Sequence, residues 1–147
     1  MKSLRLIINA FHDLVILVLP EKKKDDTYKF AFIVHPRSSD DIEKKFPFFK
    51  RIPNSITNIF TRYCWPITLS KITGLKFSKD GKNVEGYVIS VLPTAHQMFE
   101  NRPLALRRII QACVLAKKKG AKIVGLGGLI SSFSKGGLDL IDKVHLN

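Results

Sequence analysis

The chain has 147 residues, 45% of them hydrophobic, which is long enough for one domain with a core and too short for two. Its 25 lysines and arginines outnumber 12 acids and give a net charge of +13, which favours anionic partners such as nucleic acid, anionic lipid or an acidic protein. The basic residues are dispersed, and no helix-turn-helix, RNP or zinc-finger spacing occurs, so we do not expect nucleic-acid binding.

Residues 1–28 form an apolar segment followed by a charged linker. The run from residue 4 to residue 19 is too short and too interrupted by charge to span a membrane, and it lacks the small residues of a signal-peptide cleavage site. We expect a helix that packs on the core or docks on a partner through its apolar residues, which recur at helical spacing: Leu4, Ile7, Ile8, Phe11, Val15 and Val18. An interfacial helix on an anionic membrane, with the following lysines facing the lipid, is the alternative.

The main domain is expected over residues 29–147. The apolar run of residues 30–34, which ends at His35-Pro36, indicates a buried strand. Residues 38–41 are typical of a helix start, and this helix is expected to run to about Phe46. A second helix, starting near residue 54, carries apolar residues at helical spacing: Ile56, Ile59, Phe60 and Tyr63.

Two stretches rich in β-branched and apolar residues, 67–77 and 84–92, flank Asp80-Gly81 and predict an antiparallel hairpin. Residues 103–119 follow as the clearest helix, with an apolar face at Leu106, Ile109, Ile110, Cys113 and Ala116. A strand over residues 122–126 comes next. This alternation predicts an α/β fold with a mixed sheet, an antiparallel hairpin and flanking helices, and without a complete Rossmann domain.

The two cysteines, Cys64 and Cys113, show no CxxC or CxxH spacing, which favours a reducing, cytoplasmic setting over a disulfide framework. Either thiol would serve as a nucleophile if it were activated. We interpret both as small buried hydrophobes. The histidines lack ligand-spaced partners, so we predict no metal site.

A glycine corner follows the last predicted strand: Gly125, Gly127 and Gly128, then Ser131 and Ser132. It begins like a dinucleotide-binding fingerprint, but isoleucine stands at the third glycine position and no acid follows at the usual spacing. Backbone N–H groups of this turn, together with the two hydroxyls, would hold a carbonyl or carboxylate. A strand-to-helix turn with a serine N-cap is the alternative.

His35 stands at a predicted strand end, where side chains of open α/β sheets reach ligands. It would act there as an acid, a base or a polar clamp; a partly exposed strand-end residue is the alternative. We therefore predict a substrate site formed by His35, Gly127, Gly128, Ser131 and Ser132, with no catalytic residue and no metal ligand assigned.

Several short motifs occur in an order found in one enzyme family: His35-Pro36, Phe46-Pro47-Phe48, Ser70-Lys71-Ile72-Thr73-Gly74, Glu85-Gly86-Tyr87, Leu92-Pro93-Thr94, Arg107-Arg108-Ile109-Ile110-Gln111-Ala112 and Gly120-Ala121-Lys122-Ile123-Val124-Gly125-Leu126-Gly127. On these motifs the chain, from about Lys29 onwards, resembles the N-terminal domain of the long-chain acyl-(acyl-carrier-protein) reductases, close to a group labelled shikimate/quinate dehydrogenase-like. The block over residues 107–132 is the most specific part of the resemblance.

The resemblance implies a fatty acyl thioester substrate, on acyl carrier protein or coenzyme A, which the whole enzyme reduces to an aldehyde with NADPH. In that family a Rossmann domain follows this region, and the catalytic cysteine lies in or beyond it. Neither Cys64 nor Cys113 corresponds to that cysteine. We therefore expect this chain alone to bind no cofactor and to be inactive, in the cytoplasm or at a membrane surface. The alternative is a non-enzymatic module that pairs with a separate cofactor domain.

Overall fold

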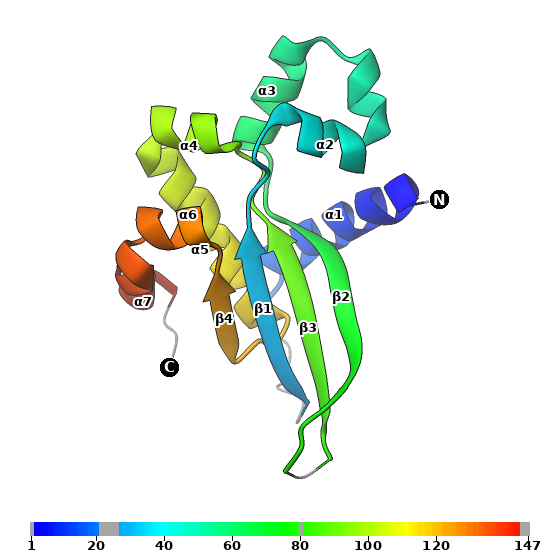
Figure 1. Cartoon of the computed structure of the whole chain (residues 1–147), viewed down its shortest axis with the longest axis vertical. Coiled ribbons are helices and arrows are strands. Elements are labelled where there is room, and N and C mark those ends of the chain that lie inside the picture. Colours follow the sequence, from blue (N-terminus) through cyan, green and yellow to red (C-terminus); the bar gives the residue numbers. More distant parts are fainter. Residues whose placement is uncertain (1, 21–26, 80, 145–147) are drawn as a thin grey trace.

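Four strands form one mixed sheet in the order β2-β3-β1-β4 (Figure 1). The computed structural model describes residues 2–20, 27–79 and 81–144. The strands are β1 (Tyr28–Val34), β2 (Ile67–Lys76), β3 (Asn83–Ser90) and β4 (Ile123–Leu126). β1 pairs in parallel with β3 and β4, whereas β2 and β3 form the predicted antiparallel hairpin. The α/β fold with a mixed sheet is thus confirmed. Asp80 of the hairpin turn and residues 21–26 of the predicted linker lie outside the described residues.

One face of the sheet packs on α5 (Arg102–Lys118), the long helix behind the strands in Figure 1. The side chains of Ala31, Ile33 and Ile89 point to this face and are almost fully buried. They meet the apolar side of α5, where Ile109 and Leu115 have no solvent exposure. The predicted helix and its apolar face are therefore placed correctly, and this face is covered by the sheet and by residues of α6 and α7.

α1 (Lys2–Val18) packs against β2 and α5, but not through most of its apolar stripe. This stripe, expected to pack on the core or to dock on a partner, is turned mostly to solvent, with Leu4, Ile8, Phe11, Val15 and Val18 all more than half exposed. Two polar residues of the opposite side face the domain instead, and their hydrogen bonds set the rotation: Asn9 Nδ2 donates to Thr68 O (3.2 Å), and Thr68 N–H donates to Asp13 Oδ2 (2.5 Å).

Asp13 lies on the inner side of α1 and has no solvent exposure, and its Oδ1 atom is 2.7 Å from Lys119 Nζ. Trp65 Nε1 donates to the Ala10 carbonyl at 2.8 Å, which adds a contact between α1 and the segment before β2. These partners satisfy a carboxylate that would cost several kcal/mol if it were buried without them.

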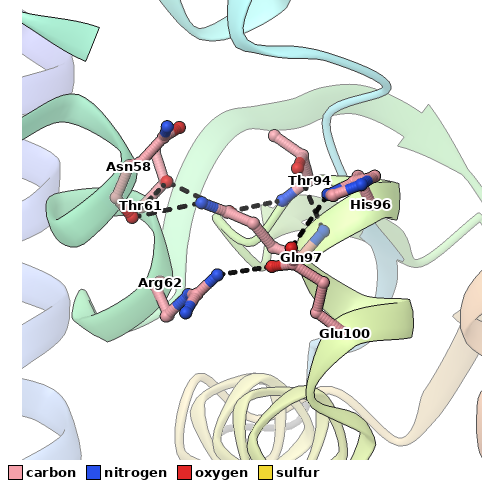
Figure 2. Close-up of polar contacts among 7 residues, drawn as sticks. All are labelled: Asn58, Thr61, Arg62, Thr94, His96, Gln97 and Glu100. Carbon is pink, nitrogen blue, oxygen red and sulfur yellow. Dashed lines mark hydrogen bonds and ion pairs between the residues drawn. The ribbon is translucent and has the colours of Figure 1, made fainter. Parts of the chain in front are cut away.

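α2 (Ser39–Lys45), α3 (Asn54–Tyr63) and α4 (Ala95–Glu100) gather beyond the end of the sheet to which β1 and β3 point (Figure 1). Figure 2 shows the polar contacts between α3 and α4, which join Asn58, Thr61 and Arg62 to Gln97 and Glu100. It also shows Thr94 and His96, whose contacts are with residues of α4 itself. Gln97 is buried, donates through Nε2 to Asn58 O (3.1 Å) and accepts at Oε1 from Thr61 Oγ1 (3.1 Å). Arg62 and Glu100 add an ion pair at 2.5 Å. α3 is thus held by its polar side.

The other face of the sheet is turned to the viewer in Figure 1, and no described helix crosses it. Phe30 and Phe32 point to this face, and their rings lie over Gly86 and Gly125, the residues opposite them in the neighbouring strands. A Cβ at Gly125 would come within 2.5 Å of the Phe32 ring, so glycine is required for this packing. Phe32 is 49% exposed and Ile123 of the edge strand 72%, which leaves an apolar surface open.

Candidate functional site

The parallel strands β1, β3 and β4 end at the same edge of the sheet, after Val34, Ser90 and Leu126. Ligands of open α/β sheets bind at this carboxyl edge. His35 follows β1 directly and lines a cavity of about 240 Å³, which we call the His35 pocket. Its walls come from the strand ends and from α2: Val34, His35, Pro36, Asp41, Ile42, Lys44, Lys45, Phe46, Leu69, Ser90 and Leu92.

The His35 ring is fixed by its own neighbour. Nδ1 lies 2.9 Å from the Pro36 carbonyl oxygen, and because a carbonyl only accepts, Nδ1 carries the donated proton. This leaves Nε2 as the acceptor of the neutral ring. Most of the pocket wall is apolar, including the buried side chains of Ile42, Phe46 and Leu92. The pocket therefore combines a largely apolar wall with His35 and four other polar residues: Asp41, Lys44, Lys45 and Ser90.

A larger cavity of about 850 Å³, the basic pocket, lies between α1, α2 and the strands β2 and β3. Its described lining contains no aspartate or glutamate, and five cationic side chains and one histidine contribute to it: Arg5, His12, Lys44, Lys45, Lys71 and Lys119. Leu6, Ile16 and Leu69 supply apolar parts of the wall. Such a cavity favours a ligand that carries negative charge.

Acids behind the wall compensate some of these cations. Lys71 Nζ is 2.8 Å from Glu85 Oε1, Lys119 pairs with Asp13, and Lys44 lies 3.8 Å from Asp41. Arg5 and Lys45 form no ion pair within the described part of the chain. They are consequently the cations best able to bind an anion from solution.

Tyr87 lines the basic pocket from β3, with the ammonium groups of Lys71 and Lys119 at 6.0 and 5.3 Å from its ring centroid. Burial raises the pKa of its phenol, and the nearby lysines Lys71 and Lys29 counteract only part of that shift. The phenol is therefore neutral at pH 7, and its hydrogen bond with the Glu85 side chain contributes to the raised pKa.

Thr68 contributes a buried hydroxyl to this wall. It lines the basic pocket, is only 5% exposed, and its Oγ1 has no hydrogen-bond partner among the described residues. A buried hydroxyl without a partner costs about 1–3 kcal/mol. The oxygen itself is shielded from solvent, so a polar ligand would reach it only if the wall beside Thr68 shifted.

The two pockets adjoin. Lys44, Lys45 and Leu69 line both of them, so the end of α2 forms a common wall. A ligand with a charged part and an apolar part has room for the first in the basic pocket and for the second in the His35 pocket. Sequence reasoning missed the basic pocket, since its cations come from four separate stretches of chain that no motif connects.

The glycine corner lies at the end of β4 and begins α6 (Gly128–Phe133). Gly127 has an extended backbone, its N–H donates to Ile33 O at 3.0 Å, and an added Cβ would lie 3.2 Å from that oxygen. The glycine is thus needed for close approach to β1. Neither predicted serine caps α6, since Ser131 and Ser132 lie inside it and Ser132 Oγ donates to Gly128 O at 3.2 Å.

The predicted site residues lie at one edge of the sheet but do not share a cavity. Ser132 lines a third cavity of about 180 Å³, together with Phe99, Arg102, Leu129 and Phe133. His35 lines only its own pocket, while Gly127, Gly128 and Ser131 line none of the three. The structure therefore brings His35 together with Lys44 and Lys45, and places the hydroxyl of Ser132 elsewhere.

Both cysteines are buried, and burial raises the thiol pKa of Cys64 to about 11 and that of Cys113 to about 12. Neither lines any of the three cavities. Among the described residues no three His, Cys, Asp or Glu side chains are grouped so as to hold a metal ion. Within the same residues, no helix has the length and apolar character needed to cross a bilayer.

Comparison with known proteins gives no relative: no protein-family model matches the chain, and no curated protein does.

Proposed function

We propose that this chain is the acyl thioester-binding portion of an NADPH-dependent fatty acyl reductase that forms aldehydes, and that hydride delivery belongs to a separate dinucleotide-binding domain. The observation that carries the proposal is the pair of adjoining pockets with Lys44 and Lys45 between them. We assign no catalytic residue in this chain.

The charge of the basic pocket suits the head of the substrate. Coenzyme A and the phosphopantetheine arm of acyl carrier protein both carry phosphate, which lysine and arginine bind by charge-assisted hydrogen bonds. Arg5 and Lys45 are placed for this contact. The net charge of +13 would also raise the association rate with an acidic carrier protein.

The His35 pocket suits the acyl end. Its apolar wall at Ile42, Phe46 and Leu92 accepts the chain, and the His35 ring lines the same pocket. Such a site binds and orients the substrate. Reduction then needs NADPH on the separate domain, as the family resemblance implies. A cytoplasmic protein, at a membrane surface or free of it, fits this role.

The test is a calorimetric titration of the isolated chain with long-chain acyl-CoA, with CoA and with NADPH. We expect saturable binding of acyl-CoA, weaker binding of CoA and none of NADPH. Lys45→Gln should weaken acyl-CoA binding about tenfold, the value of one charge-assisted hydrogen bond. The control Lys50→Gln changes an exposed lysine that lines neither pocket and should leave the affinity unchanged. Tight NADPH binding, or equal effects of the two variants, would contradict the proposal.

The uncovered sheet face favours a second candidate, a non-enzymatic module that pairs with a separate cofactor domain. Sheets with parallel strands are normally covered on both faces, and here Phe32 and Ile123 are left to a partner. Lys82 and Lys122 lie over the Tyr28 ring at 5.5 and 5.0 Å, so an apolar surface with an acidic rim fits there. A chain with this role alone would bind no acyl-CoA in the titration above.

A further inference from the structure

The outward side of α1 is a continuous apolar stripe. Leu4, Ile8, Phe11, Val15 and Val18 follow one another at spacings of three and four residues, and their exposed fractions range from 51% to 77%. Over 17 residues the helix is about 25 Å long. A row of large apolar side chains of this length on the surface marks an interaction site.

The rotation of α1 is fixed, so the stripe is unable to turn inward. Asp13 and Asn9 hold the inner side through Thr68 and Lys119, and Lys118 Nζ donates to the carbonyl oxygens of Leu17 (2.8 Å) and Leu19 (2.6 Å) at the end of the helix. The apolar stripe thus faces solvent, while the carboxylate of Asp13 on the other side of the helix is buried.

Positive charge lies beside the stripe. Arg5 and His12 stand on the flank of α1 between the stripe and the inner side, and both line the basic pocket. Lys44 and Lys45 of α2 line the same pocket. The only acid in the sequence of α1 is Asp13, which is buried and paired. An apolar row with basic residues at its side is the arrangement by which helices lie in the surface of an anionic bilayer.

We propose that α1 lies in the plane of an anionic lipid bilayer, with its outward stripe among the acyl chains and the basic flank on the headgroups. Charge selects this occupant over a second copy of the chain, because two molecules of charge +13 repel each other while anionic lipid attracts them. This proposal goes beyond substrate binding: it shares Arg5 with the basic pocket, but the outward stripe itself lines neither pocket.

The experiment is flotation of the purified chain with vesicles of phosphatidylcholine, with and without phosphatidylserine. We expect the chain to float with the anionic vesicles, to float much less with the neutral ones, and to be released by high salt. Phe11→Gln combined with Val15→Gln should reduce the partition coefficient about tenfold or more, since two large apolar side chains no longer enter the lipid. The matched control is Leu138→Gln with Ile141→Gln, on the exposed side of α7 (Leu138–Val144), which should float like the parent.

A fluorescence measurement places the helix directly. Because Cys64 and Cys113 are buried, an environment-sensitive thiol dye on Phe11→Cys labels that site selectively. Its emission should shift to the blue with anionic vesicles, whereas the same dye on Leu138→Cys should not shift. Acyl-CoA binding by the Phe11→Gln, Val15→Gln variant should be unchanged, which separates this proposal from the substrate site.

Three results would overturn the proposal. One is equal flotation with neutral and anionic vesicles, and another is undiminished flotation of the Phe11→Gln, Val15→Gln variant. The third is a lipid-free dimer of the parent that this variant dissociates, which would make the stripe a contact between copies.

Discussion

Cys64 and Cys113 illustrate how burial decides the chemistry of a single residue. Their sequence context favoured small buried hydrophobes over nucleophiles, and the structure places both in the core, with Cys113 only 1% exposed. The thiol pKa of each is raised well above the ordinary value of 9.0, mainly by desolvation. Since the thiolate is the reactive form, neither residue is activated for attack on a thioester.

The raised pKa values give a pH dependence of stability. The unfolded thiols ionise near pH 9, whereas the folded ones stay protonated to about 11 (Cys64) and about 12 (Cys113). Below pH 9 the thiols are protonated in both states and do not change the free energy of unfolding with pH. Between pH 9 and 11 the thiols ionise only in the unfolded chain, which stabilises that state. We expect the free energy of unfolding to fall in this interval by on the order of 2 kcal/mol for Cys64.

Urea unfolding at several pH values measures this slope. The double variant Cys64→Ala, Cys113→Ala should be less stable at pH 7 because of the cavities, but its stability should fall less steeply above pH 9. Equal slopes for the parent and the double variant would show that the thiols ionise as easily in the folded chain.

Residue types alone predicted only part of the candidate site. His35 was expected to face a ligand because it follows a strand, and it does line a cavity. The companions expected for it, Gly127 to Ser132, do not line that cavity. Lys44 and Lys45, which do, stand in the sequence as two ordinary helix-end lysines. Tertiary packing decides which residues line a pocket. The pattern of residue types along the sequence does not indicate which distant residues will line the same pocket.

At the scale of elements, periodicity located the helices but did not decide which side of each faces the domain. In α3 the apolar residues Ile56, Ile59 and Tyr63 share a face as expected, but this face is more than half exposed, and Thr57 and Thr61 are buried instead. Spacing reports which side chains lie together, and apolar sides usually face inward. In α1 and α3 buried polar contacts with residues tens of positions away set the opposite rotation. The strands were located, but β1 was expected to be a buried strand, and only its inner face is buried: Phe32 on the other face is 49% exposed.

The anchor of α1 is testable by Asp13→Asn. The amide still accepts from Thr68 N–H, but it leaves Lys119, whose side chain is only 9% exposed, without a counter-charge. Removing one partner of a buried ion pair typically costs about 3–5 kcal/mol, and we expect a loss near the lower end in urea unfolding. Asp139→Asn, which breaks the more exposed pair with Lys135 at 3.5 Å, should cost less than about 1 kcal/mol. Similar losses for the two variants would show that Asp13 is not the anchor.

The molecule as a whole combines a high positive charge with two apolar surfaces, the outward stripe of α1 and the uncovered sheet face. At low ionic strength the charge of +13 keeps copies apart, and salt screens that repulsion. The apolar surfaces are not weakened by salt. We therefore expect salt to promote self-association of this protein. In an assembly held together by ion pairs, salt would weaken the association instead.

Sedimentation velocity in low and high salt tests this balance. We expect a monomer at low salt and reversible association at high salt through the sheet face. Phe32→Gln combined with Ile123→Gln should restore the monomer, because it replaces the two exposed side chains of that face. A monomer at every salt concentration, or association that this variant does not reduce, would show that the sheet face does not mediate self-association.

The anchors of α1 also have a consequence for biosynthesis. α1 leaves the ribosome before β2 and α5, yet its polar partners follow 55 residues later at Thr68 and about 100 residues later at Lys118. At a translation rate of about 5–20 residues per second, α1 waits roughly 5–20 s for the last of them. For about the first half of that interval, until Thr68 is synthesised, neither of these anchors is available to the helix. Whatever first meets the nascent helix, whether chaperone or lipid, does so before the rest of the domain competes for it.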